Sequence, residues 1–344
     1  MGEKKYLIIF HKEDNDGLFS MAIIYNYLIH ELRVDRKNID LFGADFNDMK
    51  RICSDKGADK KNTIDKFMED YTNIIMTDIS FNDVNVMKKL YKKLGSNFCW
   101  IDHHAPIIKE SFVQKFDTCS GLRDTHRSAI LNAYKYFYDV FDEQYDAKNK
   151  QIELFRILSA WDSFSFEREG YGLDYVRNVN EGVNIEYNLK KDDIIDLVEW
   201  IIYGKDDSFD EHCKKITDLI EQLYLNGKKF NTIQNNRYKK LCADLGEPYQ
   251  LNANGRNALA LFTQDQTSSM VFASVKDKFT NGIVFKHKKD GTWAVSLYNT
   301  NRDDHSFHCG EYLKKNYGGG GHEGAAGAQI TETQFIKILT TKTL

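Results

Sequence analysis

The sequence predicts an α/β protein in which a parallel-sheet N-terminal domain and a smaller α/β C-terminal domain are joined by a helical connector. Three observations lead to this prediction. The chain has 344 residues, enough for about two domains of roughly 100–200 residues each. Strand-like and helix-like patterns alternate through the first half, and the pattern becomes strand-rich from about residue 256. We expect the domains to cover residues 1–189 and 251–344, with the connector at 190–250.

Strands and helices alternate in the predicted first domain. Three short apolar runs are typical of buried strands and lie at 6–10, 73–77 and 98–101. Four amphipathic patterns with helical spacing lie at 18–29, 84–94, 126–141 and 150–161. This rhythm predicts a parallel sheet with helices on both faces.

The predicted connector is helical and ends in basic residues. Apolar positions recur at helical spacing over 194–202 and again over 216–225, which indicates two helices, the second of them longer. Gly246 to Gly255 contains the residues that usually separate one element from the next. A new domain is therefore expected to begin at about residue 251.

The predicted second domain combines strands with two helices. Asp290-Gly291 between two apolar runs indicates a β-hairpin. A helix is expected over 308–316. Thr331 is suited to cap a final helix, whose expected apolar face consists of Phe335, Ile336 and Leu339.

The composition limits the classes of function. Lys and Arg total 47 against 51 Asp and Glu, a net charge of −4, so no general basic field is present to hold long nucleic acids. The sequence contains no run of about 18 apolar residues, so no transmembrane helix is predicted. The six cysteines are scattered without a CxxC pair, which argues against a zinc knuckle or a dithiol redox site. We expect reduced thiols and a cytoplasmic protein that does not contact a membrane.

Acidic and imidazole side chains follow each of the three predicted strands. Because the carboxyl ends of parallel strands meet at one edge of a sheet, we expect these groups to converge. The candidates that follow strands are His11, Asp14, Asp16, Asp78, Asp102, His103 and His104. Asp162, which follows the helical pattern at 150–161, is a further candidate. Mixed His and Asp ligands suit divalent cations, with Mn²⁺ favoured over Mg²⁺ or Zn²⁺. Two His and four Asp ligands are enough for two cations that share one carboxylate and activate water against phosphorus. A single cation needs only three or four of these groups.

Each motif taken alone has an ordinary structural explanation. Asp and Asn favour turns, so a His-x-x-Asp-x-Asp loop is often structural. An isolated Asp78 at a strand end is typical of a turn or a helix cap. Two adjacent imidazoles after a buried strand, His103 and His104, are harder to explain in this way. The prediction of a site depends on the conjunction of these motifs.

A glycine run near the C-terminus is the second candidate for ligand contact. Four glycines precede His322, and such a backbone can approach a ligand closely and present N–H groups to an anion. A flexible linker is the alternative, but the small apolar residues at 325–328 favour tight packing instead.

Together these motifs resemble the DHH phosphoesterase superfamily. The segments His11-x-x-Asp14-x-Asp16-Gly17, Asp78, Asp102-His103-His104 and Asp162 are similar to its four ordered motifs. Gly319-Gly320-Gly321-His322 followed by Ala325-Ala326-Gly327 is similar to the signature of its type 1 DHH-associated C-terminal domain. The resemblance spans nearly the whole chain, with residues 190–250 least covered. It implies an active site in the cleft between the two domains.

The resemblance also implies a role for each matching residue. One Mn²⁺ would be held by His11, Asp14 and Asp78, and a second by Asp16, Asp78, His103 and Asp162. His104 would face the scissile phosphate and Asp102 would orient the two histidines, so that His104, Asp102 and Asp78 are the candidate catalytic residues. The candidate substrate contacts are Arg302, which can grip a phosphate bidentately, and Gly319, Gly320, Gly321 and His322.

The substrate class implied is a short nucleotide polymer. The chain lacks the extra domains of the large single-strand DNA exonucleases and the membrane helices of the membrane-bound cyclic-di-AMP phosphodiesterases, so it is most similar to the oligoribonuclease (nanoRNase) and pAp phosphatase branch. We expect hydrolysis of short single-stranded RNA to nucleoside monophosphates. The alternatives are a soluble cyclic-dinucleotide or pAp phosphodiesterase, a phosphomonoesterase or pyrophosphatase, and a non-catalytic nucleotide-binding module. Whether the chain forms a homodimer is left open.

Overall fold

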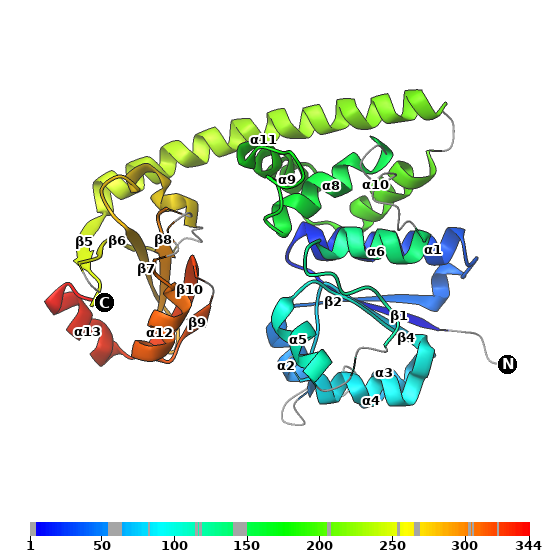
Figure 1. Ribbon diagram of the computed structural model, residues 1–344, viewed down its shortest axis with the longest axis horizontal. Coiled ribbons are helices and arrows are strands. Elements are labelled where there is room, and N and C mark those ends of the chain that lie inside the picture. Colours follow the sequence, from blue (N-terminus) through cyan, green and yellow to red (C-terminus); the bar gives the residue numbers. More distant parts are fainter. Residues whose placement is uncertain are drawn as a thin grey trace. The chain divides into compact units, whose positions relative to one another are not determined.

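The chain folds into two compact units, Met1–Lys229 and Phe230–Leu344. The computed structural model, drawn in Figure 1, describes residues 5–53, 64–81, 83–113, 116, 119–139, 150–204, 208–252, 255–264, 269–301, 304, 306–321 and 323–344. Among the helices of these residues, none combines the length and the apolar character that crossing a bilayer requires. The domain boundaries expected from the sequence stay a prediction.

A four-stranded parallel sheet forms the centre of the first unit, with the order β2-β1-β3-β4. Its strands are β1 (Tyr6–His11), β2 (Ile39–Ala44), β3 (Asn73–Thr77) and β4 (Phe98–Ile101). The residues of β3 and β4 are buried throughout, and those of β1 are buried up to His11. Strands covered on both faces are apolar at nearly every position, which is why these three could be predicted. The parallel α/β architecture is confirmed.

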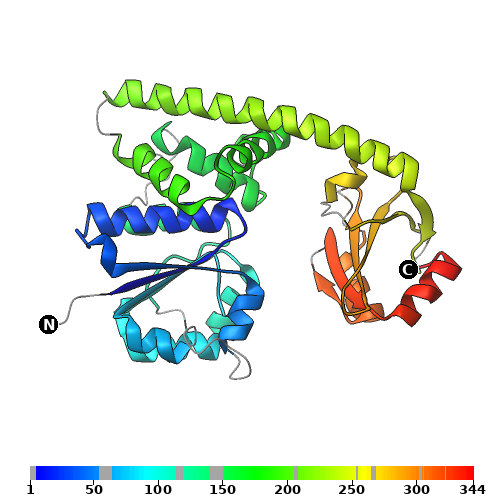
Figure 2. The same ribbon diagram turned by 180° about the vertical axis from the view of Figure 1, so that it is seen from behind.

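Helices cover both faces of this sheet (Figures 1 and 2). On one side the sheet shares a core with α1 (Asn15–His30), α6 (Ala129–Tyr138), α8 (Glu153–Asp162), α9 (Leu173–Tyr187), α10 (Lys191–Tyr203) and the first part of α11 (Phe209–Leu245), with α1 between the sheet and the outermost of these helices. The other face packs on α2 (Phe46–Cys53), α3 (Ile64–Asp70), α4 (Val84–Leu94) and α5 (Ala105–Val113). Ile8 and Phe10 belong to the first core, and Leu7 and Ile9 to the second. This alternation along β1 follows from the two-residue period of a strand.

Two helices, α10 and α11, account for most described residues of the stretch expected as a connector, and part of them also belongs to the first core. Side chains of α10 and of the first part of α11, including Val198, Ile201, Ile216 and Leu223, are buried with those of α1. Side chains of α10 and of the first part of α11 therefore stabilise the first unit.

Two glycines allow α9 and α11 to cross at close range. A Cβ atom on Gly227 would lie 1.8 Å from the carbonyl oxygen of Asn178, and one on Gly182 would lie 2.0 Å from that of Leu223. Neither distance is compatible with a side chain, so both positions require glycine for the helix axes to approach. Both glycines lie within the first unit.

The Gly227→Ala variant is expected to destabilise the first unit by about 1–3 kcal/mol, the usual cost of overpacking. Helix propensity alone predicts the opposite, a gain of about 1 kcal/mol from replacing glycine in a helix. Urea unfolding followed by tryptophan fluorescence measures the effect, because Trp100, Trp161 and Trp200 all lie in this unit. Lys229→Ala, two positions further along the exposed side of α11, is the control and should change little. A Gly227→Ala protein as stable as the wild type would contradict the close crossing.

A six-stranded mixed sheet forms the second unit, with the order β5-β6-β7-β8-β10-β9. Its strands are β5 (Glu247–Gln250), β6 (Asn257–Phe262), β7 (Asn281–His287), β8 (Trp293–Asn299), β9 (Gly320–Gly321) and β10 (Ala325–Ile330). Only the β6–β7 pair is parallel among these strands. One face packs on α12 (Cys309–Tyr317) and α13 (Glu332–Thr341), which both views show beside the sheet. The other face packs on the end of α11 and on a 3₁₀ segment, Ser269–Val275.

Two local predictions for this unit are confirmed and one is partly wrong. The hairpin of β7 and β8 turns at Asp290-Gly291, and Thr331 caps α13 in a capping box with Gln334. The apolar face of α13 differs from the expected one. Phe335 is buried as predicted, but its partner is Ile338, whereas Ile336 and Leu339 are exposed. Ile336 and Leu339 each directly follow one of the buried residues, and adjacent residues do not share a helix face.

Short 3₁₀ segments complete the first unit at Arg36–Asn38, Gly95–Asn97 and Lys150–Ile152. Cys99, Cys119, Cys213, Cys242 and Cys309 are buried free thiols, in agreement with the absence of a paired cysteine motif in the sequence.

Candidate metal centre

The predicted ligands of the first unit converge at the carboxyl ends of β1, β3 and β4. Ligand atoms lie within 4.8 Å of one another in three groups: His11, Asp14 and Asp78; Asp16, His103 and Asp162; and Asp78, His103 and His104. The first two groups match the two sets expected from the sequence, except that Asp78 falls with His103 in the third group. The third group also makes His104 geometrically able to serve as a ligand.

The loop from β1 into α1 positions His11 and Asp14. Asp14 is the N-cap of α1, where its Oδ1 accepts a hydrogen bond from the Gly17 N–H at 3.0 Å. Its Oδ2 lies 2.7 Å from His11 Nδ1. Burial by itself lowers the pKa of His11, but hydrogen bonds and the charges of Asp14 and Asp78 outweigh burial and raise this pKa to about 10. In the cation-free protein His11 therefore acts as a positive counterion for the two carboxylates.

The backbone of α6 holds Asp16. Both carboxylate oxygens accept hydrogen bonds at 2.9 Å, from the N–H groups of Ala129 and Ile130. These are the first two residues of α6, where N–H groups have no partner inside the helix and favour negative charge. The side chain of Asp16 is buried and fixed by these bonds, so its orientation toward His103 is set by the main chain.

Asp78 lies between the two ligand groups. It follows β3 in a left-handed conformation with φ of 56° and is almost completely buried. One carboxylate oxygen lies 3.6 Å from His11 Nδ1 and the other 3.3 Å from His103 Nε2. Burial, followed by the negative charge of Asp16, raises the pKa of Asp78 well above its usual range. The folded protein without a bound cation therefore disfavours the charged form of Asp78.

His103 and Asp162 complete the second ligand group. Nε2 of His103 lies 3.5 Å from Asp16 and 3.2 Å from Oδ2 of Asp162, which comes from the last residue of α8. That Oδ2 atom is buried and accepts no hydrogen bond from the described residues. Burial and the charges of Asp16 and Asp78 raise the pKa of Asp162.

Asp102 organises the two histidines. This fully buried carboxylate accepts hydrogen bonds at Oδ1 from the backbone N–H groups of His103 and His104 and from Nδ1 of His104, at 2.7, 3.1 and 2.7 Å. Its Oδ2 accepts a bond from Trp100 Nε1 at 3.0 Å. Although burial acts in the opposite direction, the bonds from His104 lower the pKa of Asp102. With Nδ1 occupied, Nε2 is the nitrogen that His104 can present to a ligand.

The donor set fits a divalent cation. Asp16, Asp78 and Asp162 are carboxylates in close proximity, and among the described residues they pair only with histidines, not with Lys or Arg. Buried charge of this kind is costly unless it is paired or coordinates a metal. The Oδ2 atom of Asp162 supplies a lone pair for such a bond. Oxygen and imidazole donors together suit Mn²⁺ and related cations.

The predicted substrate contacts belong to the second unit. Arg302 and His322 lie outside the described residues. A Cβ on Gly319 would meet the Gly327 carbonyl at 2.3 Å, and one on Gly321 would meet that of Ala325 at 2.6 Å. These glycines therefore allow β9 to pack closely on β10. Gly320 has open space beside its Cα atom. The N–H of Gly319 is already bonded to the Leu313 carbonyl, so that amide is not available to a phosphate in this conformation.

One hydrogen-bond network at the site could not be expected from local sequence. Asn15, between the candidate ligands Asp14 and Asp16, donates to Oδ1 of Asn180 and of Asn184 on α9, each at 2.9 Å. The partners are far apart in the sequence, so only the fold brings them together. They tie the ligand-bearing turn to the helix that α11 crosses.

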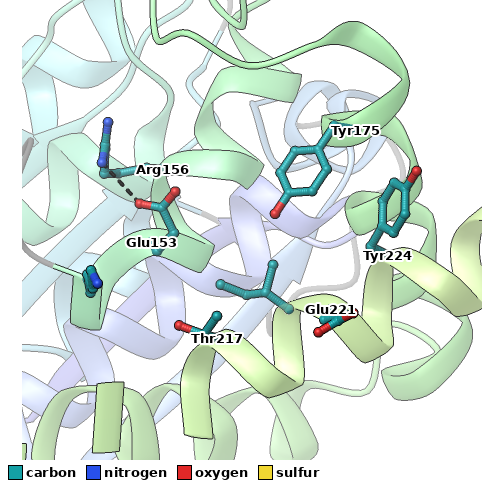
Figure 3. Close-up of a pocket in the computed structure, with 8 residues that line it drawn as sticks. Glu153, Arg156, Tyr175, Thr217, Glu221 and Tyr224 are labelled. Carbon is teal, nitrogen blue, oxygen red and sulfur yellow. Dashed lines mark hydrogen bonds and ion pairs between the residues drawn. The ribbon is translucent and has the colours of Figure 1, made fainter. Parts of the chain in front are cut away.

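A separate cavity of about 800 Å³ lies between α8, α9 and α11 (Figure 3). Glu153 and Arg156 from α8 line one side of it, and Tyr175 and Tyr224 from α9 and α11 line another. None of its lining residues is among the predicted ligands. The candidate metal centre is thus distinct from this cavity.

Comparisons with known proteins agree with the motif assignment in the first unit. Residues 5–157 match the model of the DHH family, N-terminal domain. No curated protein sequence matches the chain.

Three solved structures are similar to this chain at low sequence identity. A pGpG-specific phosphodiesterase, PggH, from Vibrio cholerae is 14% identical over 98% of this chain and 97% of its own, with a TM-score of 0.49. RecJ from Thermus thermophilus, in complex with Mn²⁺, is 12% identical over 99% of this chain and 51% of its own, with a TM-score of 0.49. An exopolyphosphatase-related protein from Bacteroides fragilis is 13% identical over 99% of this chain and 91% of its own, with a TM-score of 0.42.

The family match covers the segment that supplies every candidate ligand except Asp162. The similarity of the second unit to a type 1 DHH-associated domain stays a prediction. Residues 5–157 of this chain are therefore similar to the DHH family, N-terminal domain.

Proposed function

We propose that this protein is a metal-dependent phosphodiesterase that hydrolyses short RNA oligonucleotides to nucleoside monophosphates. The observation that carries the proposal is the buried group of carboxylates around His103, with Asp78 shared between neighbouring ligand groups. The DHH match of residues 5–157 supports the same chemistry.

The proposed ligands are six side chains. His11, Asp14 and Asp78 would hold one divalent cation, and Asp16, Asp78, His103 and Asp162 would hold the other. When bound, such a pair of cations neutralises charge on a phosphate group and lowers the pKa of water toward neutrality. Mn²⁺ is the proposed metal, with Mg²⁺ as the second choice.

His104 would act on the substrate directly. Its side chain is 39% exposed, more than that of His11 or His103, and Asp102 fixes its ring through Nδ1. Nε2 can then donate a hydrogen bond to a phosphate oxygen at the scissile bond. The hydrogen bond and the charge of Asp102 favour a protonated His104 despite its burial, and raise its pKa, which strengthens that donation.

The second unit would bind the remainder of the substrate. Arg302, Gly320 and His322 are proposed to contact a terminal phosphate or nucleotide. Short oligonucleotides suit a chain with a net charge of −4, because they present few phosphates and depend little on a broad basic surface.

Hydrolysis of a labelled RNA pentamer with Mn²⁺, Mg²⁺ or EDTA tests the proposal, with pAp and cyclic di-AMP assayed in parallel. Stepwise shortening to mononucleotides with Mn²⁺ and none with EDTA is the expected result. Turnover of pAp or a cyclic dinucleotide without shortening of the pentamer would move the function to the alternative, a cyclic-dinucleotide or pAp phosphodiesterase. Absence of turnover on all three substrates would contradict a phosphodiesterase of either kind.

A further inference from the structure

An apolar ring stands at the edge of the candidate metal centre. Phe46, the first residue of α2, lies with its ring centroid 5.4 Å from that of His11 and 5.9 Å from that of His104, the latter pair in a T-shaped arrangement. It bridges a proposed ligand of one cation and the residue proposed to meet the phosphate. Phe46 is nevertheless 37% exposed.

The position of this ring is fixed by the turn that precedes it. Asp45 Oδ1 accepts hydrogen bonds from the N–H groups of Asn47 and Asp48, both at 2.7 Å, and so caps α2. Lys12, the residue after β1, bonds to Asp48 through its Nζ and to the Ala44 carbonyl through its backbone N–H. These bonds hold the start of α2 against the end of β1, where His11 lies. Phe46 is therefore presented by an anchored turn.

The chemistry of Phe46 favours a particular class of substrate. An exposed phenyl ring offers no hydrogen bond to a phosphate chain and gains nothing from an inorganic polyphosphate or pyrophosphate. The face of a nucleobase, by contrast, stacks on aromatic side chains irrespective of its sequence, with an effect of about 1–3 kcal/mol per base. An aromatic ring beside His104 is placed to meet the base attached to the phosphate that His104 contacts.

We propose that Phe46 stacks on the base next to the scissile phosphate and selects nucleotide esters over inorganic phosphates. This inference rests on the proposed function for the identity of the reacting bond. It adds that recognition of the base occurs within the first unit, at the metal centre itself. It also accounts for an apolar side chain that would otherwise lie exposed beside a charged site.

Paired substrates test the stacking role. The diribonucleotide ApA is compared with two analogues in which one or the other ribose lacks its base, using wild-type protein, Phe46→Ala and Phe46→Leu with Mn²⁺. Phe46→Ala is expected to lower kcat/KM for ApA about tenfold or more, mainly through KM. The effect on one of the base-free analogues should be less than about twofold, because that analogue has no base to stack. Phe46→Leu, which keeps apolar contact but not the aromatic face, should lie between the two proteins.

A control variant separates stacking from general loss of an aromatic side chain. Phe209 begins α11, is 63% exposed and lines a surface pocket whose other residues include no candidate ligand, so Phe209→Ala removes an exposed phenyl group outside the candidate metal centre. It should behave as wild type on all three substrates. Equal losses on ApA and on both analogues for Phe46→Ala, or a loss of bound Mn²⁺, would show that Phe46 only supports the histidines and would overturn the inference.

A binding measurement distinguishes failure of this inference from failure of the proposed function. A dinucleotide carrying 2-aminopurine loses fluorescence when its base stacks on an aromatic ring. Quenching by wild-type protein that disappears with Phe46→Ala supports base stacking even if no substrate is cleaved. Equal quenching by both proteins would overturn the inference even if ApA is hydrolysed.

Discussion

Replacing Asp78 by asparagine is expected to reduce phosphodiester hydrolysis about a thousandfold or more. Asp78 belongs to two of the three candidate ligand groups, so loss of its carboxylate should weaken both proposed cation sites together. Cations of this kind supply several kcal/mol of transition-state stabilisation, and about 4 kcal/mol corresponds to a factor of one thousand in rate. Asparagine is preferred to alanine because residue 78 has φ of 56°, where Asp and Asn are tolerated better than other side chains.

The same substitution should stabilise the protein when no cation is bound. The pKa of Asp78 is raised above 3.8 by burial and by Asp16. A carboxyl group with a raised folded-state pKa contributes its full stability below the unfolded pKa and loses it as the pH rises through the folded pKa. At neutral pH in EDTA, the Asp78→Asn protein should therefore unfold at a higher temperature than the wild type.

Metal analysis, steady-state kinetics and thermal unfolding in EDTA check both expectations. Asp139→Asn is the matched control, because Asp139 also has a left-handed backbone, with φ of 53°, but is exposed at the end of α6. It should keep wild-type turnover and cation content. An Asp78→Asn protein that retains two cations and near-normal turnover would exclude the shared-ligand role.

Asp102→Asn is expected to lower kcat about tenfold to a hundredfold while the cations remain bound, the usual effect of losing a residue that orients a site histidine. Asp102 accepts four hydrogen bonds through its two oxygens. An asparagine side chain places an NH₂ group where one of these oxygens was, so at least one buried donor faces another donor. This mismatch should also lower the free energy of unfolding by about 1–3 kcal/mol.

The variant Trp100→Phe distinguishes the role of the bond to Oδ2 of Asp102 from the role of the bonds to Oδ1. It removes the indole donor to Oδ2 and leaves the bonds from His104 to Oδ1 intact. We expect this variant to lose stability but to keep most of its kcat, whereas Asp102→Asn loses both. If Asp102→Asn turns over as fast as the wild type, the orientation of His104 does not limit the reaction.

The parts of the fold that could be predicted are those in which burial dictates composition. The strands β1, β3 and β4 are covered on both faces and therefore consist largely of apolar runs. β2 was not predicted, because Asp40 in it is exposed and its middle residues are half-buried, whereas β4 at the opposite edge of the sheet is buried throughout. Missing β2 also meant missing Phe46, which lies two residues beyond its end. The position of Phe46 beside the site could be recognised only once the strand that precedes it was known.

The convergence of the candidate ligands could be predicted for a similar reason. Carboxylates and imidazoles at the ends of three buried strands must converge, and the described structure brings them together. The groups that hold the candidate ligands in place could not be recognised from the sequence pattern. The N–H groups that bind Asp16 are those of Ala129 and Ile130, and every residue except proline has an N–H. Asn15 and Asn180 are separated by 165 positions, a distance over which no local pattern reports contact.

The use of main-chain donors for Asp16 has a consequence for how sequence change can act on this site. A hydrogen bond from the backbone survives replacement of the side chain, so a mutation at Ala129 or Ile130 that preserves the helix also preserves both bonds. Asp102 is less protected on one side, since one of its four donors is the indole of Trp100. A substitution at position 100 can thus remove one of the four bonds to Asp102, whereas the two bonds to Asp16 do not depend on which side chains Ala129 and Ile130 carry, provided that the helix is preserved.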